Sequence, residues 1–220
     1  MPINACRFAT RRTLLAAACA GALGGCGPRI EGRGPVSTTA QLSDDALVMP
    51  DGYRMTLRQW QPGGRKRANI LALHGFNDHS GAFEIPAPLF TAQGFALFAY
   101  DQRGFGAGAT RGIWPGVDAL AADCATAAQL IAAREPGVPL ALMGESMGAA
   151  VLLVAGAAPA AARPPAAAWV LLAPAVWGRA SMNGFYRAML AAVSWALPSM
   201  AVSGANPFIK VTDDEAVLRA

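Results

Sequence analysis

Histidine is scarce in this sequence, because the 220 residues include only His74 and His79. No set of histidines, cysteines and carboxylates has the spacing of a metal site. No glycine-rich loop matches the P-loop or dinucleotide-binding patterns, and the glycine-rich turn at 104–108 lacks the helix that such a loop needs. We therefore expect neither a metal ion nor a nucleotide cofactor.

Charged residues are also few, at 15% of the chain, and the formal net charge is +4. Arg7, Arg11 and Arg12 lie in a basic N-terminal stretch, and Arg29 and Arg33 follow soon after it. The rest of the chain is close to neutral. Nothing in the charge distribution therefore indicates a nucleic-acid partner.

The first 25 residues are typical of a bacterial lipoprotein signal peptide, with a twin-arginine-like start and an apolar run too short to span a membrane. Leu23-Gly24-Gly25-Cys26 resembles a lipobox, whose cysteine is acylated after cleavage. The alternative is Sec export without lipid. We expect lipidation at Cys26, a flexible tether rich in Gly, Pro, Ser and Thr over residues 26–45, and attachment to a membrane of the bacterial cell envelope, on the periplasmic or outer side.

Cysteines in the body of the protein are correspondingly few. Cys6 and Cys19 would leave with the signal peptide and Cys26 would carry lipid, so only Cys124 remains and no internal disulfide can form. Cys124 shares an apolar helical face with Ile131, so we expect it to be a small core residue.

The most informative pattern that is present is Gly144-Glu145-Ser146-Met147-Gly148. An apolar run at 138–143 precedes it and predicts a buried strand, and a run at 149–155 predicts the start of a helix. Strand, tight turn and helix form the context of a nucleophile elbow, in which the serine is exposed above a sheet. Ser146 is then the candidate nucleophile, and the Met147 N–H faces a developing oxyanion. The alternative interpretation is a glycine-rich turn that contains a serine by chance.

Two further apolar runs end in polar loops. Residues 69–73 lead into His74-Gly75-Phe76, and residues 95–100 lead into a segment that begins with Asp101 and contains Arg103. The second segment holds no candidate nucleophile or base. We interpret it as structural, with Arg103 pairing with Asp101 or with nearby carbonyl groups to brace the loop.

Together these motifs resemble the monoacylglycerol lipase and lysophospholipase branch of the α/β-hydrolase superfamily. The resemblance covers roughly Leu47 to Ala220. It is carried by four motifs in order: His74-Gly75, His79-Ser80-Gly81, Asp101-Gln102-Arg103-Gly104-Phe105-Gly106 and Gly144-Glu145-Ser146-Met147-Gly148.

The resemblance implies a serine esterase that acts on acylglycerols or lysophospholipids, with Ser146 as nucleophile. It also implies that Phe76 and Met147 supply the two N–H groups of the oxyanion hole. A hydrophobic cap is expected after the sixth strand.

The sequence departs from this family in its general base. The superfamily orders its triad as serine, acid, histidine, yet both histidines precede Ser146. We expect His74 to anchor its loop by hydrogen bonding, and His79 is a weak candidate base. Asp213 and Asp214 fall in the expected cap. The prediction is that the sequence ends before the last two strands, which would carry the triad acid and histidine.

The predicted fold class is α/β, a doubly wound and mostly parallel sheet in a single core over residues 46–175, incomplete at its C-terminus. Apolar runs that alternate with Ala-rich helical segments predict the strands: Met55–Trp60, Asn69–Leu73, Ala96–Tyr100, Leu140–Met143 and Trp169–Ala173.

The resemblance implies that residues 176–220 form the cap segment. Within it Phe185, Met189, Ala192 and Trp195 are spaced along one helical face, which predicts a helix. Core packing of this segment is the alternative. The predicted function is ester hydrolysis through an acyl-enzyme on Ser146. The alternatives are a non-catalytic lipid-binding protein of the same fold, and a peptidase of the same fold.

Overall fold

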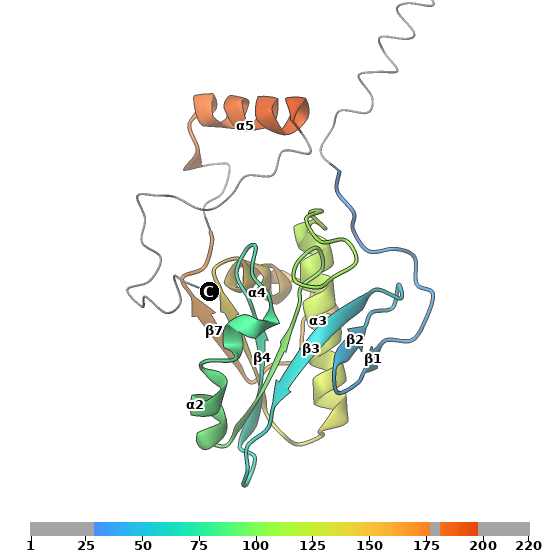
Figure 1. Cartoon of the computed structure of the whole chain (residues 1–220), viewed down its shortest axis with the longest axis vertical. Helices are drawn as coiled ribbons and strands as arrows, with labels where there is room; N and C mark the ends of the chain where they lie inside the picture. The colour runs from blue at the N-terminus through green and yellow to red at the C-terminus, as the bar shows by residue number, and fades with distance from the viewer. Residues whose placement is uncertain (1–28, 177–180, 198–220) are drawn as a thin grey trace, which may run out of the picture. The chain divides into compact units, whose positions relative to one another are not determined.

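The computed structural model describes residues 29–176 and 181–197. It divides the chain into two compact units, of which one covers residues 29–181 and the other contains the helix that follows. In the first unit the described residues form a seven-stranded sheet with strand order β1-β2-β3-β5-β4-β6-β7 (Figure 1). The strands are β1 (Gln41–Leu42), β2 (Ala46–Val48), β3 (Arg54–Trp60), β4 (Ala68–Leu73), β5 (Phe95–Tyr100), β6 (Leu140–Glu145) and β7 (Ala168–Leu172).

The sheet has a parallel part and an antiparallel part. Strands β5, β4, β6 and β7 run parallel, whereas β1, β2 and β3 form an antiparallel edge that joins β5. The five predicted strands are all confirmed, with ends that differ by no more than two residues. The predicted α/β class and mostly parallel sheet are therefore confirmed.

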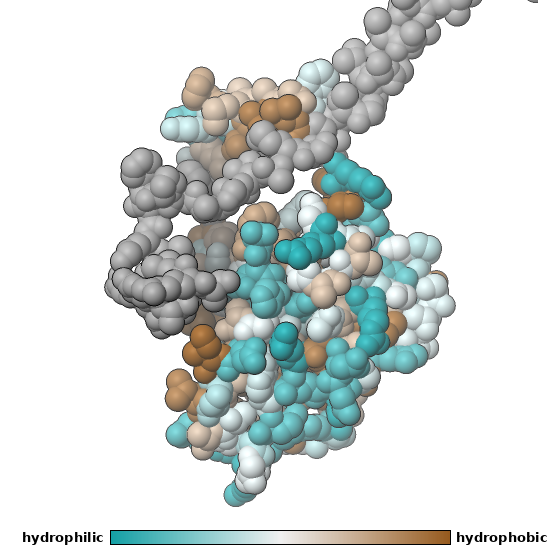
Figure 2. Space-filling model, viewed as in Figure 1, coloured by the Kyte–Doolittle hydropathy of each residue, from teal (hydrophilic) through white to brown (hydrophobic). Residues whose placement is uncertain are grey.

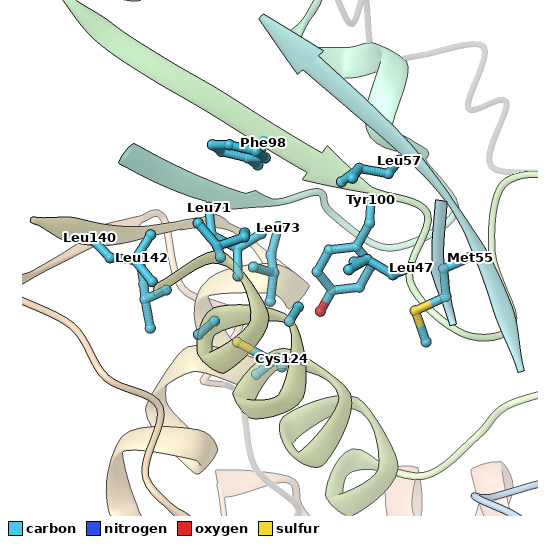
Figure 3. Packing of buried hydrophobic residues seen from close by; sticks show 14 of the residues in the cluster. Leu47, Met55, Leu57, Leu71, Leu73, Phe98, Tyr100, Cys124, Leu140 and Leu142 are labelled. Carbon is cyan, nitrogen blue, oxygen red and sulfur yellow. The ribbon is translucent and has the colours of Figure 1, made fainter. Parts of the chain in front are cut away.

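Side chains alternate along the central strands and build one apolar cluster on each face of the sheet. Leu71 and Leu73 of β4 pack with α3 (Val117–Arg134) and α4 (Met147–Ala157), as Figure 3 shows for the α3 side. Ile70 and Ala72 belong to the opposite cluster, with η1 (Ser80–Phe83) and α2 (Ala87–Ala92). Helices therefore cover both faces, as a doubly wound sheet requires. A short η2 (Ala160–Ala162) follows α4.

Cys124 lies in the first of these clusters and is fully buried, which confirms its predicted place in the core. Burial, with a smaller contribution from the charge of Asp123, raises the pKa of the Cys124 thiol to about 12. A thiol with this pKa is almost entirely protonated near neutral pH and is a poor nucleophile.

The described part of the predicted tether, residues 29–45, is held against the rest of the domain. Ile30 forms a β-bridge with Trp114, and the Gly34 N–H donates to Asp51 over 2.9 Å. Arg33 pairs with Asp123 over 3.4 Å, and residues 41–42 form β1. Glycine, serine and threonine do indicate an extended chain here, but ion pairs and strand pairing fix its path. Cys26 and the predicted signal peptide lie outside the described residues.

The second unit is described through α5 (Gly184–Ala196). Asn183 caps this helix, since its side chain accepts a hydrogen bond from the Tyr186 N–H. Hydrophobic residues extend along α5 (Figure 2). Phe185 and Trp195 are among its exposed residues. The predicted helix is confirmed, and its role in a cap stays a prediction. None of the described helices combines the length and apolar character needed to cross a membrane.

Candidate active site

Ser146 occupies the sharp turn between β6 and α4. Its backbone has φ 50° and ψ −109°, a conformation that non-glycine residues rarely adopt. Three hydrogen bonds hold it there: its N–H donates to Leu172 O over 2.9 Å, and its carbonyl accepts from the N–H groups of Ala150 and Ala175. Strain of this kind persists only where the surroundings impose it, and it is often found at functional sites.

The two glycines of the motif are required by close backbone contacts. A Cβ on Gly144 would lie 2.6 Å from the Ala149 nitrogen, which is closer than real Cβ contacts allow. A Cβ on Gly148 would overlap the carbonyl oxygen of Leu73 and would lie 2.8 Å from that of His74. The spacing of the motif therefore follows from packing the first turn of α4 directly against the end of β4.

The loop that follows β4 lies beside this serine. Leu73 is in parallel register with Gly144, so both strands end at the same edge of the sheet. A Cβ on Gly75 would stand only 3.6 Å from Ser146 Cβ, which places the loop in contact with the nucleophile's residue.

In the part of the chain that the structure describes, neither predicted oxyanion donor has an acceptor for its N–H group. The Phe76 N–H donates to no described group, and the residue is 69% exposed. Met147 is the first residue of α4, so its N–H has no acceptor within the helix. Free N–H groups on the two segments that flank Ser146 are what an oxyanion hole requires.

His74 anchors the loop, as predicted. It is fully buried; its Nε2 accepts the Gln102 N–H at 3.0 Å, so Nδ1 carries the proton and donates to Gly75 O at 2.7 Å. Burial lowers the pKa of His74. Both ring nitrogens are engaged, so His74 cannot take a proton from Ser146.

His79 is used locally as well. Its Nδ1 accepts the Gly81 N–H and caps η1. Neither histidine therefore has the arrangement of a general base, and Asp213 and Asp214 lie outside the described residues. The structure brings Ser146 and the loop of Phe76 together, without a base contributed by the described residues.

The loop after β5 braces the site, but with partners other than those we predicted. Arg103 pairs with Asp123 (Nε to Oδ2, 2.8 Å) and Asp51 (Nη1 to Oδ2, 2.9 Å), and its guanidinium lies 4.1 Å from the Tyr53 ring centroid. Asp101 instead accepts hydrogen bonds from Ser80 and Ala107. Arg103 is thus structural, as expected, but it pairs with Asp51 and Asp123 and not with Asp101, one of the two partners that we considered.

Within the described residues, no group of three or more His, Cys, Asp or Glu side chains is arranged to hold a metal ion.

The strand order, the strained serine between β6 and α4, and the neighbouring loop after β4 define an α/β-hydrolase. Residues 64–220 match the family described as serine aminopeptidase, S33, and the chain belongs to this family.

Two similar proteins belong to the monoacylglycerol lipase branch, which the sequence motifs resemble. Human monoglyceride lipase is 29% identical over 159 residues, which cover 71% of this chain and 51% of the relative. A monoacylglycerol lipase from Mycolicibacterium smegmatis is 28% identical over 116 residues, which cover 52% of this chain and 41% of the relative. The chain thus spans about half, or less, of the length of these relatives. The resemblance to the monoacylglycerol lipase branch is confirmed.

A solved structure supports the fold independently. The crystal structure of a soluble variant of monoglyceride lipase from Saccharomyces cerevisiae, in complex with a substrate analogue, superposes with a TM-score of 0.60 at 20% sequence identity. The match covers 84% of this chain and 62% of that one.

Proposed function

We propose that the protein is a serine ester hydrolase in which Ser146 forms the acyl-enzyme. The observation that carries this proposal is the strained φ of 50° at Ser146, which sets the serine at the carboxyl edge of the sheet beside Gly75. A turn with no catalytic role would favour glycine at this left-handed position, because glycine adopts a positive φ without strain. A serine here carries backbone strain that contributes nothing to stability.

In the proposed reaction Ser146 Oγ attacks the ester carbonyl, and its proton passes to a general base. The tetrahedral oxyanion accepts hydrogen bonds from the Phe76 and Met147 N–H groups. The alcohol then leaves with that proton, and water hydrolyses the acyl-enzyme to the free acid and Ser146. Because neither His74 nor His79 is arranged to accept the proton, the base must be another residue.

The proposed substrates are monoacylglycerols or lysophospholipid-like acyl esters. The names of the human and mycobacterial relatives support a monoacylglycerol. The apolar residues of α5 support an acyl substrate, since a helix with exposed Phe185 and Trp195 offers surface that suits an acyl chain. We propose that this helix belongs to a cap over the acyl group.

A peptidase is the second candidate, and the description of the family as serine aminopeptidase favours it. The two candidates share the nucleophile and differ in the leaving group. The test uses the full-length protein with a monoacylglycerol, a short p-nitrophenyl ester and an amino-acid p-nitroanilide. Hydrolysis of both esters, lost in Ser146→Ala, supports the proposal, whereas faster hydrolysis of the anilide supports the peptidase.

If the protein is a non-catalytic lipid-binding protein, we expect a third result: it would bind monoacylglycerol without Ser146-dependent turnover. A fluorophosphonate probe distinguishes this protein from a hydrolase, because the probe labels an activated serine. A mass-spectrometric adduct on Ser146 supports the hydrolase, and an adduct on Ser80 or Ser181 alone, or none, refutes it.

We also propose that the protein is exported and anchored by a lipid on Cys26. The lipobox-like sequence before Cys26 supports this proposal. A membrane anchor suits an enzyme whose substrates are lipids.

A further inference from the structure

Two loops leave neighbouring strands at the same edge of the sheet. Strands β4 and β5 are parallel and paired up to Ala72 and Ala99, so the segments that follow them start side by side. The segment after β4, residues 74–80, carries Gly75 beside Ser146 and the free Phe76 N–H. The segment after β5 begins with Asp101 and Gln102, both buried.

Gln102 holds the first end of the 74–80 segment. Its backbone N–H donates to His74 Nε2 at 3.0 Å, and its side-chain Nε2 donates to the His74 carbonyl at 2.8 Å. Both residues are fully buried, so water does not compete for these bonds.

Asp101 holds the other end of that segment. Its Oδ1 accepts both the Ser80 N–H at 2.8 Å and the Ser80 hydroxyl at 2.7 Å. Its Oδ2 accepts the Ala107 N–H at 2.8 Å, which ties the carboxylate to its own loop. Ser80 is 1% exposed, so this contact is sealed from solvent.

Between the two fixed ends the segment makes a left-handed turn at Asn77, which has φ 59°, a conformation that asparagine tolerates. A loop released at either end would be free to change this turn, and the neighbouring Phe76 N–H would move with it. Hydrogen-bond strength falls steeply with distance and angle, so a small displacement would weaken a bond to an oxyanion.

We infer that Asp101 and Gln102 are positioning residues, which act together to hold the Phe76 N–H in place for the oxyanion formed at Ser146. Neither touches the reacting atoms. The inference rests on the proposed function and adds to it a pair of residues from the neighbouring strand.

The chemistry of Asp101 makes this assignment specific. Each carboxylate oxygen accepts a backbone N–H, one from Ser80 and one from Ala107. An asparagine in the same place has one oxygen and one NH₂ group, so either orientation sets a donor against a backbone N–H. Asp101→Asn therefore weakens the hydrogen bonds that hold Ser80 and Ala107, while it hardly changes the side-chain volume.

The experiment compares Asp101→Asn, Gln102→Met and Ser80→Ala with wild type in the full-length protein. Ile131→Val, a core change on α3 remote from both loops, is the matched control. We measure kcat and KM for a short p-nitrophenyl ester, Ki for a trifluoromethyl ketone that forms an oxyanion on the serine, and the thermal midpoint.

We expect kcat to fall about 10- to 100-fold in Asp101→Asn and Gln102→Met, somewhat less than the loss of a whole oxyanion donor. KM should change less than about threefold, and Ki for the ketone should rise by the same factor as kcat/KM falls. Ser80→Ala keeps its N–H and should show a smaller loss in the same direction. Ile131→Val should keep the wild-type kcat.

Unchanged kcat and Ki in the folded variants would overturn the inference, as would equal losses in Ile131→Val. If Asp101→Asn does not fold, Gln102→Met and Ser80→Ala decide in the same way. Failure of the proposed function would look different, because wild type itself would then lack Ser146-dependent turnover.

Discussion

Arg103 and Asp123 form an ion pair that is buried on both sides, with side-chain exposures of 3% and 1%. Asp51 joins the same guanidinium, and its carboxylate is 4% exposed. The three residues come from the loop before β3, the loop after β5 and helix α3. The cluster therefore ties three distant segments of the domain together.

Removing the arginine should destabilise the protein strongly. Arg103→Leu leaves the buried carboxylate of Asp51 without its arginine and leaves Asp123 with only the 3.4 Å contact to Arg33. Breaking a buried ion pair by removing one partner typically costs about 3–5 kcal/mol. Urea denaturation measures this loss. The control is Arg54→Ala, which breaks the exposed pair with Asp45 and should cost at most about 1 kcal/mol. Similar losses for the two variants would contradict the structural role of Arg103.

Gly148→Ala should disrupt the nucleophile elbow, because a methyl group there overlaps the Leu73 carbonyl oxygen. We expect loss of fluorophosphonate labelling at Ser146 together with a lower melting temperature. Gly63→Ala is the matched control, since its Cβ would meet no atom within 4 Å. Wild-type labelling of Gly148→Ala would show that the turn can shift without harm to the serine.

His74 should make stability depend on pH in mildly acidic solution. Burial lowers its pKa in the folded protein, so the unfolded chain binds the proton more readily. This contribution to stability is complete above the unfolded pKa of about 6.5 and is lost as the pH falls below it.

Asp101 also has a lowered pKa: burial opposes its ionisation, but hydrogen bonds from Ala107 and Ser80 outweigh burial. Its contribution is lost only below about pH 4.

The measurement is the urea midpoint between pH 7 and pH 5 for wild type, His74→Gln and His79→Gln. The decline with falling pH should be shallower in His74→Gln, which has no imidazole at the buried position. His79→Gln removes the exposed histidine and serves as the control. Parallel declines in wild type and His74→Gln would refute the assignment of the titration to His74.

Cys26→Ser should release the protein from the membrane fraction if lipid at this position provides the anchor. Metabolic labelling with an alkyne fatty acid should mark wild type and leave the variant unmarked. Cys19→Ser is the control and should behave as wild type. A variant that stays in the membrane fraction would show that another part of the protein holds it there.

Local sequence patterns were sufficient to predict the parallel strands and the position of Ser146. Apolar runs of five or six residues between glycine-rich turns leave few alternatives, and the elbow motif depends on neighbours in sequence. The helix over Gly184–Ala196 follows from spacing in the same way.

Contacts between residues far apart in the chain could not be predicted from local sequence patterns. Arg103 is separated from Asp51 by 52 residues, and Asp101 from Ser80 by 21 residues. Once β4 and β5 are known to be parallel neighbours, however, the meeting of their following loops can be anticipated. The short β1 and β2 strands were missed because two or three residues carry no periodicity, and pairing with β3 stabilises them.

The bridge between Ile30 and Trp114 has a geometric consequence if the proposed lipid on Cys26 is present. Trp114 stacks edge-on with Phe105, and Phe105 does so with Phe76, so this bridge lies close to the Phe76 loop. Cys26 precedes Ile30 by four residues, which reach at most about 14 Å when fully extended. With an acyl chain on Cys26, a connection of this length would keep Ile30 close to the lipid headgroups. Substrate would then arrive by lateral diffusion in the bilayer.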